Sequence, residues 1–297
     1  MRRLLISAAA LAVLGGGIFW VVTAPKPLDA AQTAGLAGDV TRGESVFWAA
    51  GCASCHMAPQ AKDEAQLVLA GGQRFASPFG TFLAPNISPD PDHGIGGWSL
   101  ADFANALTRG VSPQGTHYFP AFPYNAYNKM QMQDLADLKA FMDTLPASAT
   151  QSQPHEIPFP FNIRRSLGGW KFLFENKNWV LNGDLTEVEA RGRYLVEAQA
   201  HCGECHTPRN ILGGLDRSKW LAGAPNPSGK GRIPNITPAA LNWSEGEIVE
   251  YLTTGFTPEF DSVGGHMVHV VENMARLPES DRASIASYLK RVPPISN

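Results

Sequence analysis

The sequence has few charged residues, and it contains only one long apolar run. Charged residues make up 17% of the 297 residues, compared with roughly 25% in typical soluble domains. The formal net charge is −3, so no basic surface for nucleic acid is predicted. A single apolar run excludes a membrane protein with several spans. We find no Ser-His-Asp set, no Gly-rich phosphate loop and no paired catalytic carboxylates, so no enzyme active site is predicted.

Cysteine is also scarce, but its four copies form two pairs with identical spacing. The pattern Cys-x-x-Cys-His occurs at residues 52–56 and again at 202–206. It is the covalent attachment site of c-type haem, in which two thiols add to the porphyrin vinyl groups and the histidine binds iron. Zinc-binding pairs would lie about 15–20 residues apart, whereas these pairs are 150 positions apart in numbering. The sequence therefore predicts two covalently bound haem c groups, attached at Cys52, Cys55, Cys202 and Cys205, with His56 and His206 as iron ligands.

The N-terminus predicts where the protein is located. Residues 4–22 carry no charge and follow two arginines. Nineteen helical residues reach roughly 28 Å, close to the hydrocarbon thickness of a bilayer. The segment is either a cleaved secretory signal or a retained anchor, and we favour a retained single span. The positive-inside rule then places the chain from Pro25 onward outside the cytoplasm, so we expect a single-pass protein of the bacterial inner membrane with its haem domains in the periplasm.

The chain after this segment contains an internal repeat. Its two copies share a Pro-Asn-Ile-Ser/Thr-Pro segment, a Trp-Ser pair, a glycine 12 residues after that tryptophan, and a closing amphipathic helix. In the first copy these four features lie, in chain order, at 85–89, 98–99, Gly110 and 133–145. In the second copy they lie at 234–238, 243–244, Gly255 and 279–292. Such self-similarity predicts two units of the same fold.

The local signals in both copies are those of helices. Ser99 and Ser244 are predicted N-caps, and Gly110 and Gly255 suit the left-handed position that ends a helix. No convincing alternating strand pattern is present, so we predict an all-α fold with two small domains, each built around a haem. The predicted boundaries are a membrane anchor or signal at 1–27, a first domain at 36–147, an aromatic-rich linker at 148–184 and a second domain at 185–297. The linker is expected to lie along the domain surfaces; the alternative is a docking patch for a membrane or a partner protein.

The second axial ligand of each iron is harder to predict. A methionine there raises the reduction potential and makes an electron carrier, whereas an open position permits catalysis or ligand binding. In the second unit we predict Met267, 12 residues after Gly255. The equivalent residue of the first unit is Phe122, which cannot bind iron, so we predict Met130 instead. The alternatives are Met274, His266 and His269 in the second unit, and Met132 and His117 in the first.

The chain resembles a known family, the membrane-anchored dihaem cytochromes c that are electron-transfer subunits of periplasmic dehydrogenases. It is similar to the cytochrome subunits of membrane-bound alcohol and gluconate dehydrogenases. The motifs that carry this resemblance lie within residues 38–294, at 51–56, 85–89, 120–124, 159–164 and 201–209. The resemblance implies two tandem class I cytochrome c-like domains after one N-terminal transmembrane helix. Family members with Phe at position 122 resemble this chain in carrying a Met at position 130, which favours Met130. The third haem motif of the alcohol dehydrogenase subunits is absent here.

Two function classes follow. The leading one is an electron carrier, not itself an enzyme. It would take electrons from a periplasmic dehydrogenase subunit or a quinol-oxidising complex and pass them to a soluble cytochrome or a terminal oxidase of a respiratory chain. The alternative is a dihaem enzyme, either a peroxidase or a thiosulfate-oxidising cytochrome, whose first haem is open or bound by a second histidine.

Overall fold

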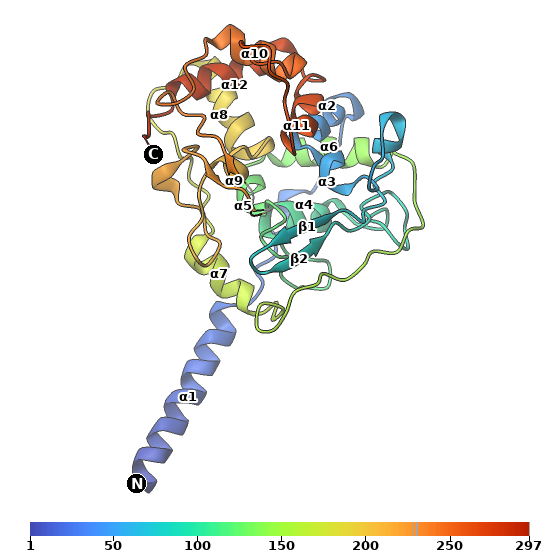
Figure 1. Cartoon of the computed structure of the whole chain (residues 1–297). Helices are drawn as coiled ribbons and strands as arrows, with labels where there is room; N and C mark the ends of the chain where they lie inside the picture. The colour runs from blue at the N-terminus through green and yellow to red at the C-terminus, as the bar shows by residue number, and fades with distance from the viewer. Residues whose placement is uncertain (228, 230, 297) are drawn as a thin grey trace.

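The computed structural model describes residues 1–227, 229 and 231–296. It consists of a folded body from which one long N-terminal helix, α1 (Arg2–Val22), projects (Figure 1). The most apolar 18-residue stretch of this helix has a mean hydropathy of 2.2, and none of that stretch is buried in the protein. By length and composition it is able to span a membrane, as predicted.

The body has two halves that follow each other along the chain. The first half contains η1 (Ala30–Gln32), α2 (Val40–Ala50), α3 (Cys52–His56), η2 (Asp63–Leu67), β1 (Arg74–Ser77), β2 (Gly80–Leu83), α4 (Leu100–Arg109), α5 (Tyr124–Tyr127) and α6 (Met132–Met142). After α7 (Ser166–Phe174), the second half contains α8 (Glu187–Tyr194), the π-turn η3 (Leu195–Gln199), α9 (Gly203–His206), η4 (Arg217–Lys219), β3 (Ala224–Pro225), β4 (Arg232–Ile233), α10 (Glu245–Thr254), α11 (Met267–Met274) and α12 (Glu279–Arg291).

The first and last helices of each half cross at a glycine. A Cβ on Gly43 of α2 would lie 1.9 Å from the carbonyl oxygen of Asp137 in α6. A Cβ on Gly192 of α8 would lie at the same distance from the carbonyl oxygen of Ser284 in α12. Real Cβ atoms do not approach carbonyl oxygens so closely, so only glycine allows the two backbones to touch. The same close crossing in both halves agrees with the repeat seen in the sequence.

An ion pair accompanies each crossing. Arg42 of α2 binds Asp137 through Nε and Nη2, at 2.7 and 3.1 Å. Arg191 of α8 binds Asp281 of α12 through the same two nitrogens, at 2.8 and 2.7 Å. Two parallel bonds fix the direction of the guanidinium plane, so each pair sets the register of its helix crossing.

The Arg42–Asp137 pair predicts a dependence of stability on pH. Burial of Asp137 favours its neutral acid, but hydrogen bonds from Arg42, from Gln133 and from a backbone N–H outweigh it and lower the pKa below its ordinary value of 3.8. The unfolded chain therefore takes up this proton at a higher pH than the folded protein. Stability from this group is complete above about pH 4 and is lost as the pH falls through the lower native pKa.

Denaturant unfolding at about pH 5 and about pH 3 measures this effect. We expect the wild type to lose more stability between these two pH values than Asp137→Asn, which has no carboxyl at this site. Equal losses in the two proteins would remove Asp137 as a source of acid sensitivity.

The predicted helix ends are confirmed. Ser99 and Ser244 cap α4 and α10, and each forms a reciprocal capping box with the acidic side chain three residues later. Gly110 and Gly255 end the same helices with φ values of 55° and 79°. These are left-handed conformations that favour glycine.

The prediction that the chain has no strands is wrong in detail. The fold is rich in helix, but β1 pairs antiparallel with β2 and β3 with β4. These strands have four or two residues, too few for an alternating pattern to be visible in the sequence. A turn holds the first hairpin, with Ser77 Oγ donating to the Gly80 carbonyl at 2.8 Å. Glu156 of the linker pairs with Thr81 of β2 through two backbone hydrogen bonds, of 2.9 and 3.1 Å.

The two halves share one hydrophobic core. A single cluster of buried side chains includes Phe47 and Leu138 from the first half together with Leu195 and Ile285 from the second. The linker also packs on the body. Glu197, which is 2% exposed, accepts hydrogen bonds from the backbone N–H groups of linker residues 180 and 181, at 2.6 and 3.1 Å. The halves are therefore fixed against each other, and this part of the linker is not a free tether.

Candidate haem sites

The two cysteine motifs lie on short helices that follow tight turns. Gly51, with φ of 64°, ends α2 and begins α3, so the chain turns directly into Cys52 and Cys55. In the second half His201, with φ of 43°, precedes α9. All four cysteines have free thiols, and the second cysteine of each motif is exposed. Thiols that are not paired in disulfides and that reach the surface of the fold are suited to form thioether bonds to an added group.

Each motif histidine is held by the same backbone contact. His56 Nδ1 lies 2.9 Å from the carbonyl oxygen of Pro85, and His206 Nδ1 lies 2.8 Å from that of Pro234. Because a carbonyl only accepts hydrogen bonds, Nδ1 carries the proton and Nε2 keeps its lone pair. Burial lowers the pKa of both rings, which favours the neutral imidazole. Each ring is thus prepared to donate Nε2 to iron, with its orientation fixed by a second contact.

The proline that orients each histidine is itself held by the next residue. Asn86 Nδ2 donates to the carbonyls of Ser148 and Thr150 at 2.7 and 2.9 Å. Asn235 Nδ2 donates to the carbonyl of Ile295 at 2.7 Å. Each asparagine therefore ties its Pro-Asn-Ile loop to the chain just beyond the last helix of its half. The sequence pointed to these loops, but it did not reveal that the proline carbonyls orient the histidines.

The loops that would carry the second ligands keep the same register in both halves. The residue eight positions after each helix-ending glycine donates a backbone hydrogen bond to it: Tyr118 to Gly110 at 2.8 Å and Val263 to Gly255 at 2.7 Å. Phe122 and Met267 therefore lie at the same offset, four residues after this hydrogen bond, although Phe122 is in a turn and Met267 begins a helix. Met267 is the first residue of α11 and is half-buried against the core. Phe122 packs edge-on against the rings of Tyr118, Tyr124 and Tyr127.

The structure distinguishes among the candidates of the first half. Met130 is 4% exposed and lies in the core, two residues before α6 begins. Met132 is the first residue of α6 and is only half-buried. His117 Nε2 lies 2.9 Å from the Thr23 carbonyl, so this nitrogen is already engaged at the end of α1. Met130 is therefore more buried than Met132, and His117 Nε2 is committed to a different contact; Met130 as the ligand stays a prediction.

The two motifs lie close to each other, which the sequence did not predict. Cys55 keeps some exposed surface, but the protein atoms crowded around its thiol displace water and raise its pKa to about 11, and the nearby thiol of Cys205 adds to this shift. Tyr127 lies between the motifs: its hydroxyl donates to the Ala50 carbonyl at 3.0 Å, and its ring meets that of His201 edge-on at 5.4 Å. Asn273 of α11 also donates to Ser54 Oγ at 2.8 Å. Groups attached at the two motifs are therefore neighbours.

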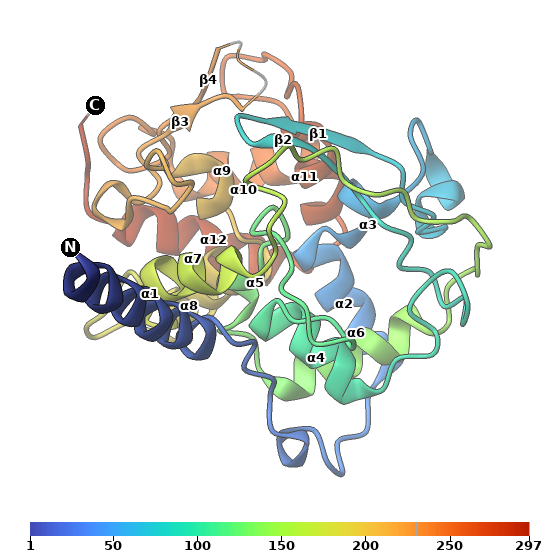
Figure 2. The same ribbon diagram turned by 90° about the horizontal axis from the view of Figure 1, so that it is seen from below.

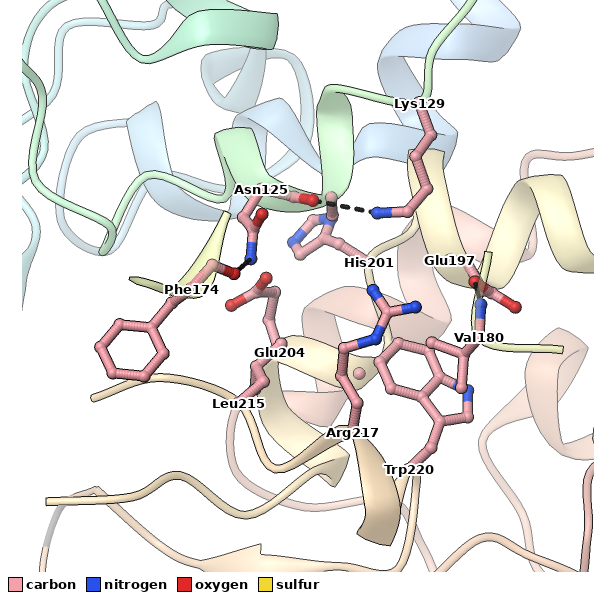
Figure 3. A pocket seen from close by; sticks show the side chains of 12 residues that line it. Asn125, Lys129, Phe174, Val180, Glu197, His201, Glu204, Leu215, Arg217 and Trp220 are labelled. Atoms are coloured by element: carbon pink, nitrogen blue, oxygen red, sulfur yellow. Dashed lines mark hydrogen bonds between the residues drawn. The ribbon is translucent and has the colours of Figure 1, made fainter. Parts of the chain in front are cut away.

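A small cavity lies beside the second motif, between the halves (Figure 3). Its volume is about 30 Å³, room for roughly one water molecule. Lys129 enters it and donates to the Asn125 carbonyl at 3.0 Å, opposite Glu204 and Arg217 (Figure 3). Burial lowers the pKa of Lys129 to about 8.

The chemistry of these residues fits a covalently attached haem better than a bare metal ion. Within residues 1–227, 229 and 231–296, no group of three or more His, Cys, Asp or Glu side chains is placed to hold an ion. Each motif instead offers two free thiols and one oriented imidazole. This donor set matches a porphyrin that brings four of the six iron ligands itself.

Comparison with known proteins also indicates covalently attached haem. The sequence model of the cytochrome c family matches residues 40–146. A diheme cytochrome c-type protein of Cereibacter sphaeroides is 58% identical over 295 residues, which cover 99% of this chain and 100% of that protein. The chain belongs to the dihaem c-type cytochromes. As a member of this family it carries two covalently bound haem c groups and transfers electrons.

This cytochrome is also similar to larger subunits of dehydrogenases. The fructose dehydrogenase cytochrome subunit of Gluconobacter japonicus is 38% identical over 91% of this chain and 55% of that protein. The alcohol dehydrogenase (quinone) cytochrome c subunit of Gluconobacter oxydans is 32% identical over 86% of this chain and 55% of that subunit. The chain thus spans about half the length of these two relatives. The family resemblance inferred from the sequence motifs is confirmed.

Proposed function

We propose that this cytochrome is a membrane-attached electron carrier of the bacterial periplasm, with one haem in each of two tandem domains at 36–147 and 185–297. The observation that supports this most strongly is the pair of identically held histidines. In both halves a proline carbonyl fixes the Nδ1 proton and leaves Nε2 free as an iron ligand. A chain that builds the same ligand site twice, beside a cavity with room for roughly one water, is suited to pass electrons.

Each residue of a site has a separate task in this proposal. Cys52 and Cys55 attach the first haem, and Cys202 and Cys205 attach the second. His56 and Met130 would supply the protein ligands of the first iron, and His206 and Met267 those of the second. The haem supplies the Fe(III)/Fe(II) couple, while the protein supplies ligands, burial and orientation. Thioether sulfur opposite histidine raises the reduction potential, which suits a carrier that accepts electrons from a dehydrogenase.

We expect the replacement Met130→Ala to open the first haem. The ferrous variant should bind carbon monoxide at one haem, and the potential of that haem should fall, because methionine ligation raises it. Difference spectra with carbon monoxide and a redox titration measure both effects. Met132→Ala is the matched control and should leave both haems unchanged.

The same experiment tests the alternative function. The presence of Phe122 at the offset that Met267 has in the second half is the observation that favours an enzyme with an open first haem. Rapid carbon monoxide binding by the ferrous wild type, together with turnover of peroxide or thiosulfate, would replace the carrier proposal. A Met130→Ala spectrum identical to that of the wild type would remove Met130 as a ligand.

We further propose a dehydrogenase as the electron donor and a soluble cytochrome or terminal oxidase as the acceptor. Two relatives are the cytochrome subunits of a fructose dehydrogenase and an alcohol dehydrogenase, which supports the first part. The test is to purify the full chain from native membranes in mild detergent and to add sugars, alcohols and other substrates one at a time. Reduction of both haems by one substrate would support a bound dehydrogenase. Reduction by added quinol alone would favour a quinol-oxidising complex as the donor.

A further inference from the structure

The end of α1 is not a flexible tether but part of the folded body. Thr23, the residue that follows the helix, is only 2% exposed. Its carbonyl accepts a hydrogen bond from His117 Nε2 at 2.9 Å, and its hydroxyl accepts one from Arg165 Nε at 3.1 Å. The Arg165 guanidinium also stacks on the ring of Trp20 at 4.1 Å. The direction in which α1 leaves the body is therefore fixed.

The helix α7 packs directly on this end of α1, at the base of the body (Figures 1 and 2). A Cβ on Gly168 of α7 would lie 2.3 Å from the Thr23 carbonyl oxygen, so the two backbones approach as closely as glycine permits. Next to this contact, an apolar groove of about 500 Å³ runs between the helices. It is lined by Ile18, Phe19 and Val22 of α1 and by Phe172 and Leu173 of α7.

The outer face of α7 is apolar and uncovered. Phe172 and Leu173 are 73% and 63% exposed. The only charged residue of α7, Lys171, points the other way: it is 8% exposed, and its Nζ donates to the Gly110 carbonyl at 2.8 Å. No charge of this helix would therefore have to lose its water if the outer face entered an apolar phase.

Neighbouring loops extend this face. Trp170 Nε1 donates to the Leu212 carbonyl at 2.9 Å, which ties the loop around residue 212 to α7. The exposed apolar residues here, which we name the α7 platform, are Phe159, Phe161, Phe172, Leu173, Ile211 and Leu212. Soluble surfaces rarely group so many large apolar side chains, and such groups mark interaction sites.

The position of the platform relative to α1 identifies what covers it. The 21 residues of α1 are about 31 Å long, which matches a hydrocarbon core of about 30 Å. Phe172 and Leu173 share the groove with residues 18–22, and they are therefore level with the last turn of α1, which is about 6 Å long. Interfacial helices bury their apolar face about 5–10 Å into the boundary between headgroups and acyl chains.

We propose that the α7 platform lies in the lipid boundary of the bilayer that α1 spans. This inference rests on the proposed membrane attachment through α1. The fixed angle of α1 and the lipid contact of α7 together give the body two points of support on the membrane. The two motifs are then held at one height and in one orientation above the lipid surface, where a membrane-bound partner would meet them.

Site-specific labelling tests the platform in the full chain with both haems attached. All four native cysteines form thioethers in this state, so an introduced cysteine is the only free thiol. Three variants are compared in phosphatidylcholine–phosphatidylglycerol vesicles: Leu173→Cys on the platform, Leu14→Cys within α1, and Phe260→Cys. Phe260 is 87% exposed on the loop that follows α10. The helix α10 lies at the end of the body away from α1 (Figure 1). Each variant carries an environment-sensitive fluorophore, and unchanged haem spectra confirm that each is folded.

We expect the labels at 173 and 14 to shift their emission to the blue. Nitroxide-bearing lipids should quench them and aqueous iodide should not, while the label at 260 should behave in the opposite way. If iodide quenches the label at 173 as it does at 260 while the label at 14 stays in lipid, the platform proposal fails and the anchor stands. If mass spectrometry shows that α1 has been removed while the label at 173 remains in lipid, the anchor fails and the platform stands. If α1 has been removed and the label at 173 is in water, both fail.

Discussion

Replacing Cys202 and Cys205 together by alanine should halve the haem that stays with the chain, from the two groups of the wild type to one. The remaining haem should be the one attached at residues 52–56, because thioether bonds at one motif do not depend on the thiols of the other. Acid–acetone extraction removes haem that is not covalently bound, and the iron and the pyridine haemochrome of the extracted protein are then measured. The Cys52→Ala/Cys55→Ala double variant should give the same stoichiometry.

Ser54→Ala is the control for this experiment. It changes a variable position within the first motif and removes the hydrogen bond from Asn273, but it leaves both thiols in place. It should keep two haems per chain. Two covalent haems in either cysteine double variant would contradict the assignment of the attachment residues.

Gly43→Ala should cause a large loss of stability without touching a haem ligand. The new Cβ would lie 1.9 Å from a backbone carbonyl oxygen, so α2 and α6 have to move apart. Overpacking of this kind costs about 3 kcal/mol, and the free energy of unfolding in denaturant measures it. Gly192→Ala, at the equivalent crossing of α8 and α12, should behave in the same way.

Gly246→Ala is the matched control for the crossing glycines. Gly246 also lies in a helix, α10, but a Cβ there would have no atom within 4 Å. Alanine has a higher helix propensity than glycine, so this variant should be unchanged or more stable by less than about 1 kcal/mol. If Gly43→Ala and Gly246→Ala gave equal stabilities, the close crossing would not be a determinant of the fold.

The features that the sequence predicted correctly are governed by residues close together in the chain. The caps at Ser99 and Ser244 and the left-handed glycines at 110 and 255 depend on contacts within about one helical turn. The cysteine motifs are equally local. The repeat could be recognised because matched residues, such as Asn86 and Asn235, recur at nearly constant spacing.

The features that were missed depend on contacts over long distances in the sequence. His56 is oriented by a carbonyl 29 residues away, and a proline carbonyl has no side-chain signature. Tyr127 contacts Ala50 and His201, which lie beside the two motifs, but its sequence neighbours gave no indication of this. The strand pairs escaped because four residues are too few to show a period of two. The shared core was not predicted either, because each half was expected to be a separate domain built around its own haem.

The shared core has a consequence for electron exchange between the two irons. If the halves were joined only by residues 148–184, their separation would vary with linker length and conformation. In this protein, buried side chains of both halves belong to one cluster, and Tyr127 bonds to Ala50 beside the first motif and packs on His201 beside the second. The distance between the two irons is therefore set by the packed protein interior. Changes in the length of the linker should leave the rate of electron transfer between the irons unaltered.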